Sequence, residues 1–154
     1  MQRTIITGPE TPVLHAKNAR VKDVSTPEIQ TLLQDMVETM RQADGIGLAA
    51  PQIGVSLRVC VTEIDGMVRY FINPTITSYS REKILFEEGC LSIPKKFLLI
   101  ERSESITIRY TDERGIERKE KPRGLQAICL QHELDHLDGV LIVDRYKEQI
   151  KKRK

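Results

Sequence analysis

Apolar positions in the first third of the chain recur at the spacing of an α-helix. Ser25 or Thr26 can cap such a helix, and Pro27 suits its first turn. The apolar positions that follow are Ile29, Leu32, Leu33, Met36, Val37 and Met40. Because these residues share one helical face, the pattern predicts a helix with one buried side that ends before Gly45.

The part of the chain that follows shows the pattern of β-strands. Two apolar-rich runs, residues 57–64 and 67–73, flank Asp65 and Gly66, which are a strong signal for a two-residue hairpin turn. Cys60 lies in the first run, where we expect a small buried side chain. Further strands are predicted at residues 75–80, 83–87, 98–102, 105–111 and 116–121.

A second helix is predicted to begin at residues 122–124 and to end near Leu137, because the Asp-Gly pair after it is a common helix stop. A last short strand is predicted at residues 140–143. One helix, several antiparallel strands and a second helix make an α+β fold. Since no repeat or linker divides the chain, we expect one domain over residues 1–146 and a short basic tail over residues 147–154.

Composition narrows the class of protein. The 154 residues suit one domain with one core, and 24 basic against 22 acidic residues give a net charge of only +2. This balance shows no basic footprint, so we expect no specific nucleic-acid partner. We expect no membrane span, since no apolar run approaches the roughly 20 residues that one needs. An odd count of 3 cysteines and the lack of a secretory signal predict a cytoplasmic protein.

Residues 132–136 read His-Glu-Leu-Asp-His inside the predicted second helix, which is the motif HExxH. Residues four apart lie on one face of a helix, so His132 and His136 can bind one metal ion. Glu133, next to the first histidine, can reach a water molecule at that ion. The alternative at this point is two surface histidines on an ordinary helix.

A catalytic metal site needs a third protein ligand and an open position. The familiar HExxH peptidases take that ligand from a downstream His or Glu. The position six residues after His136 is Ile142, and the only glutamate beyond His136 is Glu148 in the basic tail. We therefore expect the third ligand to come from upstream.

The best upstream candidate is Cys90, because a thiolate binds divalent metals strongly and Gly89 allows an unusual turn beside it. Cys129 is the rival, three residues before His132 in the same helix. A thiol one turn back would hardly complete a tetrahedral site with both histidines. We therefore favour Cys90 as the ligand and expect Cys129 to line a pocket.

Residues 45–52, Gly-Ile-Gly-Leu-Ala-Ala-Pro-Gln, predict a close-packed loop that a backbone or a substrate approaches. This segment lacks the Gly-Lys-Ser/Thr ending of a phosphate-binding loop and the third glycine of a dinucleotide fingerprint. It also follows a predicted helix, whereas those motifs follow a strand. Nucleotide binding is therefore not expected.

Three segments, GIGLAAPQ at residues 45–52, EGCLS at 88–92 and QHELDH at 131–136, resemble the three signature motifs of peptide deformylases in order and spacing. A weaker resemblance extends from residues 12–14 to residues 124–129. The resemblance implies antiparallel sheets packed around a central HExxH-bearing helix, with an N-terminal helix. It also implies a metal-dependent hydrolase that removes the formyl group from N-terminal formyl-methionine of nascent polypeptides and releases formate.

The resemblance assigns roles to single residues. The implied metal ligands are Cys90, His132 and His136. Glu133 would accept the proton of the attacking water and pass it to the leaving amine. The Gln52 side-chain amide and the Leu91 backbone N–H would stabilise the oxyanion, although Gln52 could also be a plain surface residue.

The resemblance also implies a binding site for the formyl-methionine peptide. Its expected residues are Gly45, Ile46, Gly47, Phe86, Glu88, Gly89, Leu125, Ile128 and Cys129. The aliphatic members could equally be ordinary core residues. Glu88 would orient a ligand histidine. Arg102 would hold the site together or meet the substrate backbone, with a surface role as the alternative.

The resemblance implies one divalent metal ion, Fe²⁺ in the cell, with Zn²⁺, Ni²⁺ or Co²⁺ as possible substitutes. Residues 147–154 could dock on the ribosome, or they could be a frayed, solvated terminus. Two other functions stay open from the sequence. They are a general HExxH metallopeptidase and a non-catalytic RNA- or ribosome-binding module on the same fold.

Overall fold

The computed structural model describes residues 1–153, and Lys154, the last residue of the predicted tail, lies outside the described residues. The helices are α1 (Pro27–Gln42), α2 (Gly124–Leu137) and α3 (Ile142–Lys152), with short 3₁₀ turns η1 (Pro12–His15) and η2 (Ala50–Ile53). The strands are β1 (Gly47–Ala49), β2 (Val59–Ile64), β3 (Met67–Tyr79), β4 (Lys83–Cys90), β5 (Ile93–Ser103), β6 (Ile106–Thr111) and β7 (Glu117–Glu120).

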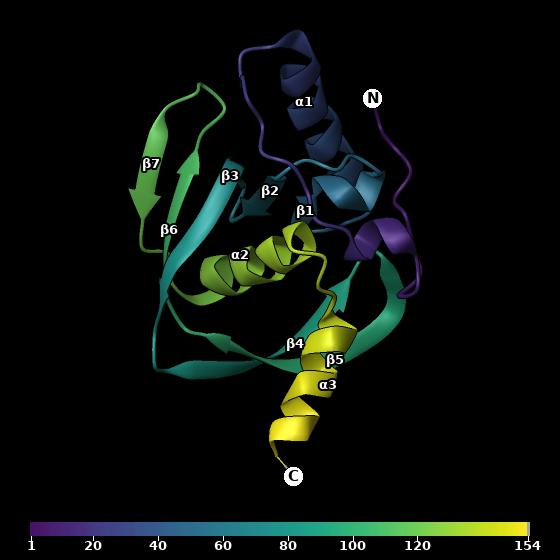
Figure 1. Ribbon diagram of the computed structural model, residues 1–154, viewed down its shortest axis with the longest axis vertical. Coiled ribbons are helices and arrows are strands. Elements are labelled where there is room, and N and C mark those ends of the chain that lie inside the picture. The colour runs from purple at the N-terminus through teal and green to yellow at the C-terminus, as the bar shows by residue number, and fades with distance from the viewer. Residues whose placement is uncertain (154) are drawn as a thin grey trace.

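All strand pairs are antiparallel and form two sheets. Five strands lie in the order β1-β2-β3-β6-β7, and β4 pairs with β5 alone. Helix α2 lies between the two sheets, where it contacts β1 and β2 on one side and β5 on the other (Figure 1). This α+β arrangement confirms the predicted fold class. In the described part of the chain, no helix is long and apolar enough to cross a membrane.

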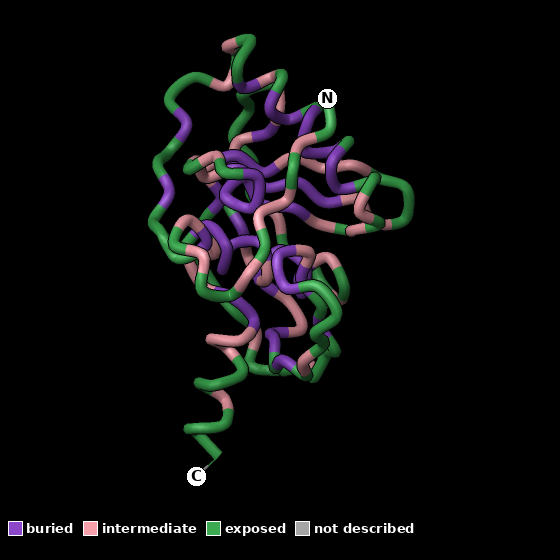
Figure 2. Tube along the Cα trace, turned by 90° about the vertical axis from the view of Figure 1, so that its right-hand side faces the viewer, coloured by how far each residue is buried: buried purple, intermediate pink, exposed green. Residues whose placement is uncertain are grey.

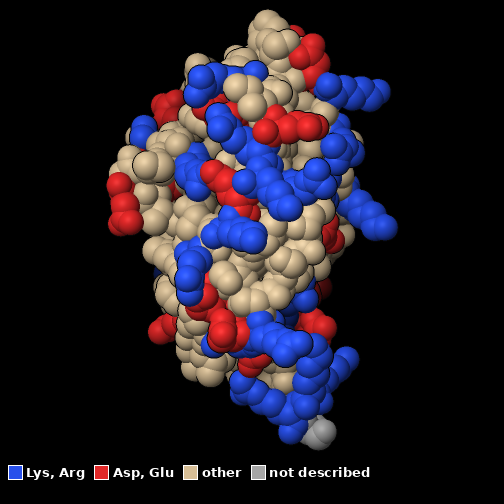
Figure 3. All heavy atoms as spheres, turned by 90° about the vertical axis from the view of Figure 1, so that its left-hand side faces the viewer, with Lys and Arg blue, Asp and Glu red and all other residues tan. Residues whose placement is uncertain are grey.

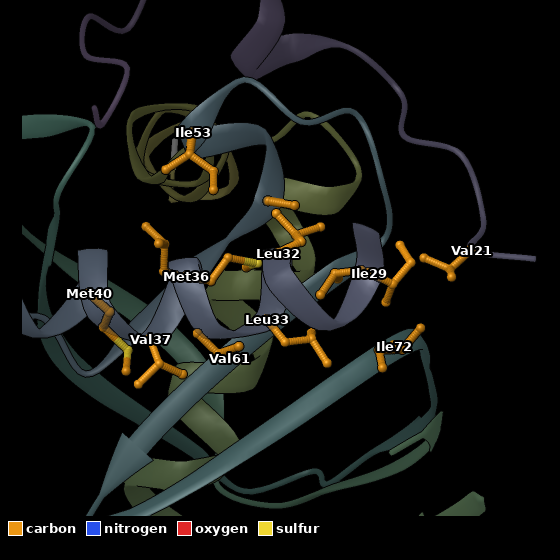
Figure 4. Close-up of a cluster of buried hydrophobic side chains, with 13 residues drawn as sticks. Val21, Ile29, Leu32, Leu33, Met36, Val37, Met40, Ile53, Val61 and Ile72 are labelled. Atoms are coloured by element: carbon orange, nitrogen blue, oxygen red, sulfur yellow. The ribbon is translucent and has the colours of Figure 1, made fainter. Parts of the chain in front are cut away.

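Helix α1 begins and packs as the sequence predicts. The Thr26 hydroxyl accepts a hydrogen bond from the Ile29 backbone N–H at 3.3 Å, so Thr26 is the cap. The apolar face of α1 packs on Val61 of β2 and Ile72 of β3 (Figure 4). Burial of this face anchors α1 on the five-stranded sheet, and the loop that follows α1 leads into β1.

The hairpin between β2 and β3 is confirmed. Asp65 and Gly66 have φ values of 53° and 74°, as a tight turn with two left-handed residues requires. The two strands predicted at residues 67–73 and 75–80 are instead the single strand β3. The strand register shifts between Ile72 and Thr75, so the Asn-Pro break in the sequence marks a bulge and not a strand end.

The short apolar run at residues 140–143 is not the predicted strand, which was wrong. Ile142 begins α3, and the Asp144 carboxylate accepts a hydrogen bond from the Leu141 N–H at 2.8 Å at its start. So short an apolar run fits a strand or a buried helix start equally well. Leu141 and Ile142 are buried, whereas most of the rest of α3 is exposed (Figure 2).

Strands β4 and β5 extend beyond their predicted ranges, and Cys90 is the last residue of β4. The register shifts between Gly89 and Cys90 where β4 ends. On the other side of α2, the helix buries Leu130 and Leu137 against Phe71 and Cys60, which confirms Cys60 as a small core side chain. Helix α2 is therefore fixed by packing on the five-stranded sheet, which leaves its other face toward β4.

Candidate metal centre and substrate cavity

Helix α2 and the end of β4 bring three metal-binding side chains together. One ligand atom each of Cys90, His132 and His136 lies within 4.8 Å of the other two. The Sγ atom of Cys90 lies 3.3 Å from Nε2 of His136. The two histidines share a helical face. The thiol comes from the end of β4, where Cys90 lies 42 residues before His132 in the sequence.

Cys129 is not part of this cluster. Its Sγ lies 3.8 Å from the Ile46 carbonyl oxygen, and burial raises the pKa of this thiol well above its usual value. A buried, protonated thiol acts as a small apolar side chain. The geometry therefore separates the two cysteines that the sequence offered: Cys90 stands with the histidines, and Cys129 lies against the loop that contains Ile46.

The donor set fits a divalent metal ion. A thiolate and two imidazoles are ligands that Zn²⁺ and Fe²⁺ accept, and three protein ligands leave one position open. Nδ1 of His132 lies 2.8 Å from the Glu88 carboxylate, so its Nε2 is the atom left for a metal. Burial lowers the pKa of His136 well below its usual value, which keeps that imidazole neutral and able to coordinate.

Glu133 is a buried carboxylate without a described partner for one of its oxygens. Its Oε2 atom makes no hydrogen bond within residues 1–153, and burial raises the pKa of Glu133 to about 7. A Cβ atom on Gly47 would lie 2.6 Å from Glu133 Oε1, so only a glycine lets the β1 backbone pass this close. The carboxylate is therefore buried beside the cluster and lies close to the β1 backbone.

Gln52 is buried with 1% of its surface exposed, which excludes the plain surface role. Its Oε1 accepts a hydrogen bond from the Ala49 backbone N–H at 2.9 Å. Its Nε2 donates to the Ser92 hydroxyl at 3.1 Å and lies 3.8 Å from Cys90 Sγ. These bonds orient the side chain so that the amide N–H group, and not the carbonyl oxygen, faces the cluster.

Glu88 and Arg102 form a buried ion pair behind His132. The Arg102 guanidinium donates to both Glu88 oxygens, at 2.7 and 2.9 Å, and it also donates to Asp135 at 2.7 Å. Burial opposes the charged carboxylate, yet the hydrogen bonds from Arg102 and His132 lower the pKa of Glu88 below its usual value. Arg102 is only 5% exposed, so a surface role is excluded.

A cavity of about 560 Å³ opens beside the donor cluster. All nine residues expected to bind the substrate line it, namely Gly45, Ile46, Gly47, Phe86, Glu88, Gly89, Leu125, Ile128 and Cys129. Gln52, Leu91 and Glu133 line it too. The predicted substrate residues therefore meet in one space, although they come from three separate segments of the chain.

One side of this cavity was not predicted from the sequence. Residues 94–97 of β5, Pro-Lys-Lys-Phe, line it together with Asp44. A Cβ atom on Gly89 would meet the Phe97 ring at 2.7 Å, so the ring covers this glycine. The pairing of β4 with β5 brings these residues to the cavity. No local pattern in the sequence predicts that pairing.

An antiparallel α+β fold with a Cys-His-His cluster beside a buried carboxylate defines a small metal-dependent hydrolase. Residues 3–152 match the family described as polypeptide deformylase. The chain is 51% identical over 133 residues to the peptide deformylase of Pseudothermotoga lettingae, covering 86% of this chain and 77% of that one. The chain therefore belongs to the polypeptide deformylase family, hydrolases that remove the formyl group from N-terminal formyl-methionine.

Solved structures agree with this assignment. The peptide deformylase of Thermotoga maritima superposes with a TM-score of 0.90 at 39% identity, over 94% of this chain and 97% of that chain. A class I type b peptide deformylase from Acinetobacter baumannii, solved with Met-Ala-Ser bound, gives a TM-score of 0.90 at 29% identity, over 94% and 98% of the two chains. These relatives favour neither the general metallopeptidase nor the RNA-binding module.

Proposed function

We propose that Cys90, His132 and His136 hold one divalent metal ion and that Glu133 moves the proton in the hydrolysis of the formamide. The observation that carries this proposal is the convergence of the three donor atoms within 4.8 Å beside a buried carboxylate oxygen without a described partner. An orphaned buried polar atom is costly unless a ligand or water satisfies it. A metal ion with its water would satisfy Glu133.

The bound ion would act as a Lewis acid that makes a water molecule acidic near neutral pH. Glu133 would accept the proton of the attacking water and deliver it to the leaving amine, which frees formate and the N-terminus of methionine. Nε2 of Gln52 and the backbone N–H of Leu91 would donate hydrogen bonds to the oxyanion. Support for Gln52 comes from the hydrogen bonds that orient its amide toward the cluster.

The cavity would receive the formyl-methionine end of a peptide. Its lining includes the apolar side chains of Ile46, Leu125 and Ile128, which suit an unbranched thioether chain. Gly45 and Gly89 also border the cavity, and the lack of a Cβ atom there lets the Leu91 and Phe97 side chains lie close against the backbone. The Acinetobacter baumannii relative is described with Met-Ala-Ser bound, which supports a peptide that begins with methionine.

The central experiment is formate release from a short formyl-Met peptide, measured for the wild type and for Glu133→Ala. We expect the variant to lose at least about a hundredfold in kcat, as general acid–base catalysis predicts, and to keep its metal. Met-starting peptides without the formyl group serve as the control substrate, and we expect no cleavage. Wild-type activity in the variant would remove Glu133 from the mechanism.

We propose Fe²⁺ as the metal in the cell, with Zn²⁺, Ni²⁺ or Co²⁺ as substitutes in purified protein. Ligand types alone accept all four ions. The test is metal analysis of protein purified without oxygen, together with activity after reloading with each ion. Iron at one equivalent, lost along with activity on exposure to air, is the expected result. Zinc at one equivalent in anaerobic protein would contradict it.

We also propose that α3 docks on the ribosome, in the cytoplasm where formylated chains emerge. Its support is the exposed basic side chains Lys147, Lys151, Lys152 and Arg153. Lysines and arginines gather at this end of the molecule (Figure 3). Lys147→Glu combined with Lys151→Glu should weaken co-sedimentation with ribosomes, whereas Lys119→Glu on β7 should not. Equal co-sedimentation of all three proteins would end this proposal.

A further inference from the structure

An unbroken chain of charged hydrogen bonds runs from helix α3 to a proposed metal ligand. Arg145 of α3 donates to both oxygens of Asp135, from Nε at 3.0 Å and from Nη2 at 2.7 Å. Asp135 accepts a further bond from Arg102 Nη1 at 2.7 Å. Arg102 donates hydrogen bonds to both oxygens of Glu88, and Oε1 of Glu88 lies 2.8 Å from Nδ1 of His132.

The chain alternates in charge and is buried along most of its length. The side chains of Glu88, Arg102 and Asp135 are 4%, 5% and 12% exposed, whereas that of Arg145 is 40% exposed. Within this chain of hydrogen bonds, Asp135 is therefore the carboxylate that accepts from two guanidinium groups, those of the buried Arg102 and the more exposed Arg145. Without Arg145, the three remaining charged groups would carry one uncompensated negative charge in a largely dry environment.

We propose that Arg145 is a positioning residue for the metal site, and that α3 thereby sets the orientation of His132. The inference rests on the proposed function, since it takes His132 as a metal ligand. It adds a residue of α3 that lies outside the three signature segments and outside the substrate cavity.

The physical reason lies in how Arg102 is shared. Arg102 gives two donor groups to Glu88 and one to Asp135. If Arg145 is removed, the Asp135 Oδ1 atom loses its described partner and the carboxylate competes with Glu88 for the Arg102 guanidinium. A Glu88 carboxylate with weaker hydrogen bonds from Arg102 is held less rigidly, and it therefore orients the His132 imidazole less well. Loss of a direct partner of a ligand histidine typically costs about 10- to 100-fold in metal affinity.

The alternative is that Arg145 only holds α3 against the rest of the protein and has no effect on the metal site. The chain offers a matched control that tests this alternative. Arg58 donates to Asp138 at 2.8 Å and to the Leu137 carbonyl at 3.1 Å, at the C-terminal end of the same helix α2. This contact ties another segment to α2 but has no described link to Glu88 or His132. Arg58→Ala therefore removes a comparable tether and leaves the charged chain intact.

The experiment measures the dissociation constant for Zn²⁺ by chelator competition, together with the melting temperature of each metal-free protein. For Arg145→Ala we expect the Zn²⁺ dissociation constant to rise about 3- to 10-fold, less than for a direct partner of the ligand. Arg145→Lys should recover part of the affinity, because it keeps the charge but cannot grip both oxygens. Arg58→Ala should bind Zn²⁺ as the wild type does.

A Zn²⁺ dissociation constant within twofold of the wild type in both Arg145 variants would overturn the proposal, whatever happens to the melting temperature. A rise in Arg58→Ala equal to that in Arg145→Ala would also overturn it, because the effect would then follow from loosening α2. The proposed function fails separately: in that case the wild type itself would bind no Zn²⁺ at one equivalent or would release no formate from a formyl-Met peptide.

Discussion

At the scale of single residues, Gly47 shows how tightly the backbone and the reacting groups are packed. A Cβ atom there would lie 2.6 Å from Glu133 Oε1 and 2.8 Å from Cys129 Sγ. Both clashing atoms end side chains, so they can shift while the fold stays intact. The cost of a side chain at this position should therefore fall on the position of Glu133 and not on folding.

We predict that Gly47→Ala lowers kcat for formate release by about 10- to 100-fold, because a small misplacement of a reacting group is that costly. Zn²⁺ affinity should stay near the wild-type value, since the three atoms nearest to the added Cβ belong to Glu133 and Cys129 and not to the donor cluster. The measurement pairs steady-state kinetics with a thermal melt. An unchanged kcat would show that Glu133 tolerates the displacement.

Gln52 allows a second prediction at this scale. Gln52→Ala removes the proposed oxyanion donor and should lower kcat by about 10²- to 10³-fold. Ser92→Ala is the matched control. Ser92 accepts a hydrogen bond from Gln52 Nε2 and so helps to position the amide, but it would itself donate no hydrogen bond to the oxyanion. We expect the Ser92 variant to lose much less activity. Equal losses in the two variants would point to the local structure and not to the amide itself.

At the scale of elements, the hairpin between β6 and β7 depends on one buried carboxylate. Asp112 accepts hydrogen bonds from the backbone N–H groups of Arg114 and Ile116, both at 2.9 Å, and from Arg118 Nε at 2.8 Å. Burial alone would raise the pKa of Asp112, but these hydrogen bonds outweigh it and lower the pKa below its usual value. The ionised carboxylate therefore stabilises the turn.

We predict that Asp112→Ala lowers the free energy of unfolding by about 2 kcal/mol at pH 7. Because the pKa of Asp112 is lower in the folded than in the unfolded protein, its contribution is complete above the unfolded pKa of about 4. It is lost as the pH falls through the lower folded pKa. Urea unfolding from pH 7 to pH 3 should show the difference narrowing below about pH 4. A difference independent of pH would contradict this account.

At the scale of the whole molecule, the proposed metal would join two parts of the fold. Cys90 stands at the end of β4 in the two-stranded sheet, and the histidines stand on α2, which packs on the five-stranded sheet. A ligand that binds only the folded state stabilises it by about 2.7 kcal/mol at a hundred times its dissociation constant. For a chain of this size that corresponds to a rise in Tm of about 5–10 °C.

We predict this rise when metal-free protein is saturated with Zn²⁺, and its loss in Cys90→Ser. Differential scanning calorimetry with and without a chelator measures it. Cys129→Ser is the control, since Cys129 lies outside the donor cluster, and it should keep the metal-dependent rise. A rise that persists in Cys90→Ser would remove Cys90 from the ligand set.

The sequence by itself determined those features whose signal is local. Helical periodicity identified α1, the Asp65-Gly66 pair identified the hairpin, and the spacing of His132 and His136 placed two imidazoles on one face of α2. In each case the residues that matter lie within a few positions of one another. Hydrogen bonding and side-chain direction over such distances depend little on the rest of the chain.

Only the tertiary structure decided what depends on distant segments. The run at residues 140–143 fits a strand or a helix, and its burial together with the Asp144 cap selects α3. Pairing of β4 with β5 brings residues 94–97 to the cavity, and packing of α3 on β5 brings Arg145 to Asp135. Such contacts join residues far apart in the sequence, and they form only when the sheets and helices pack, because burial and charge pairing belong to the assembled core.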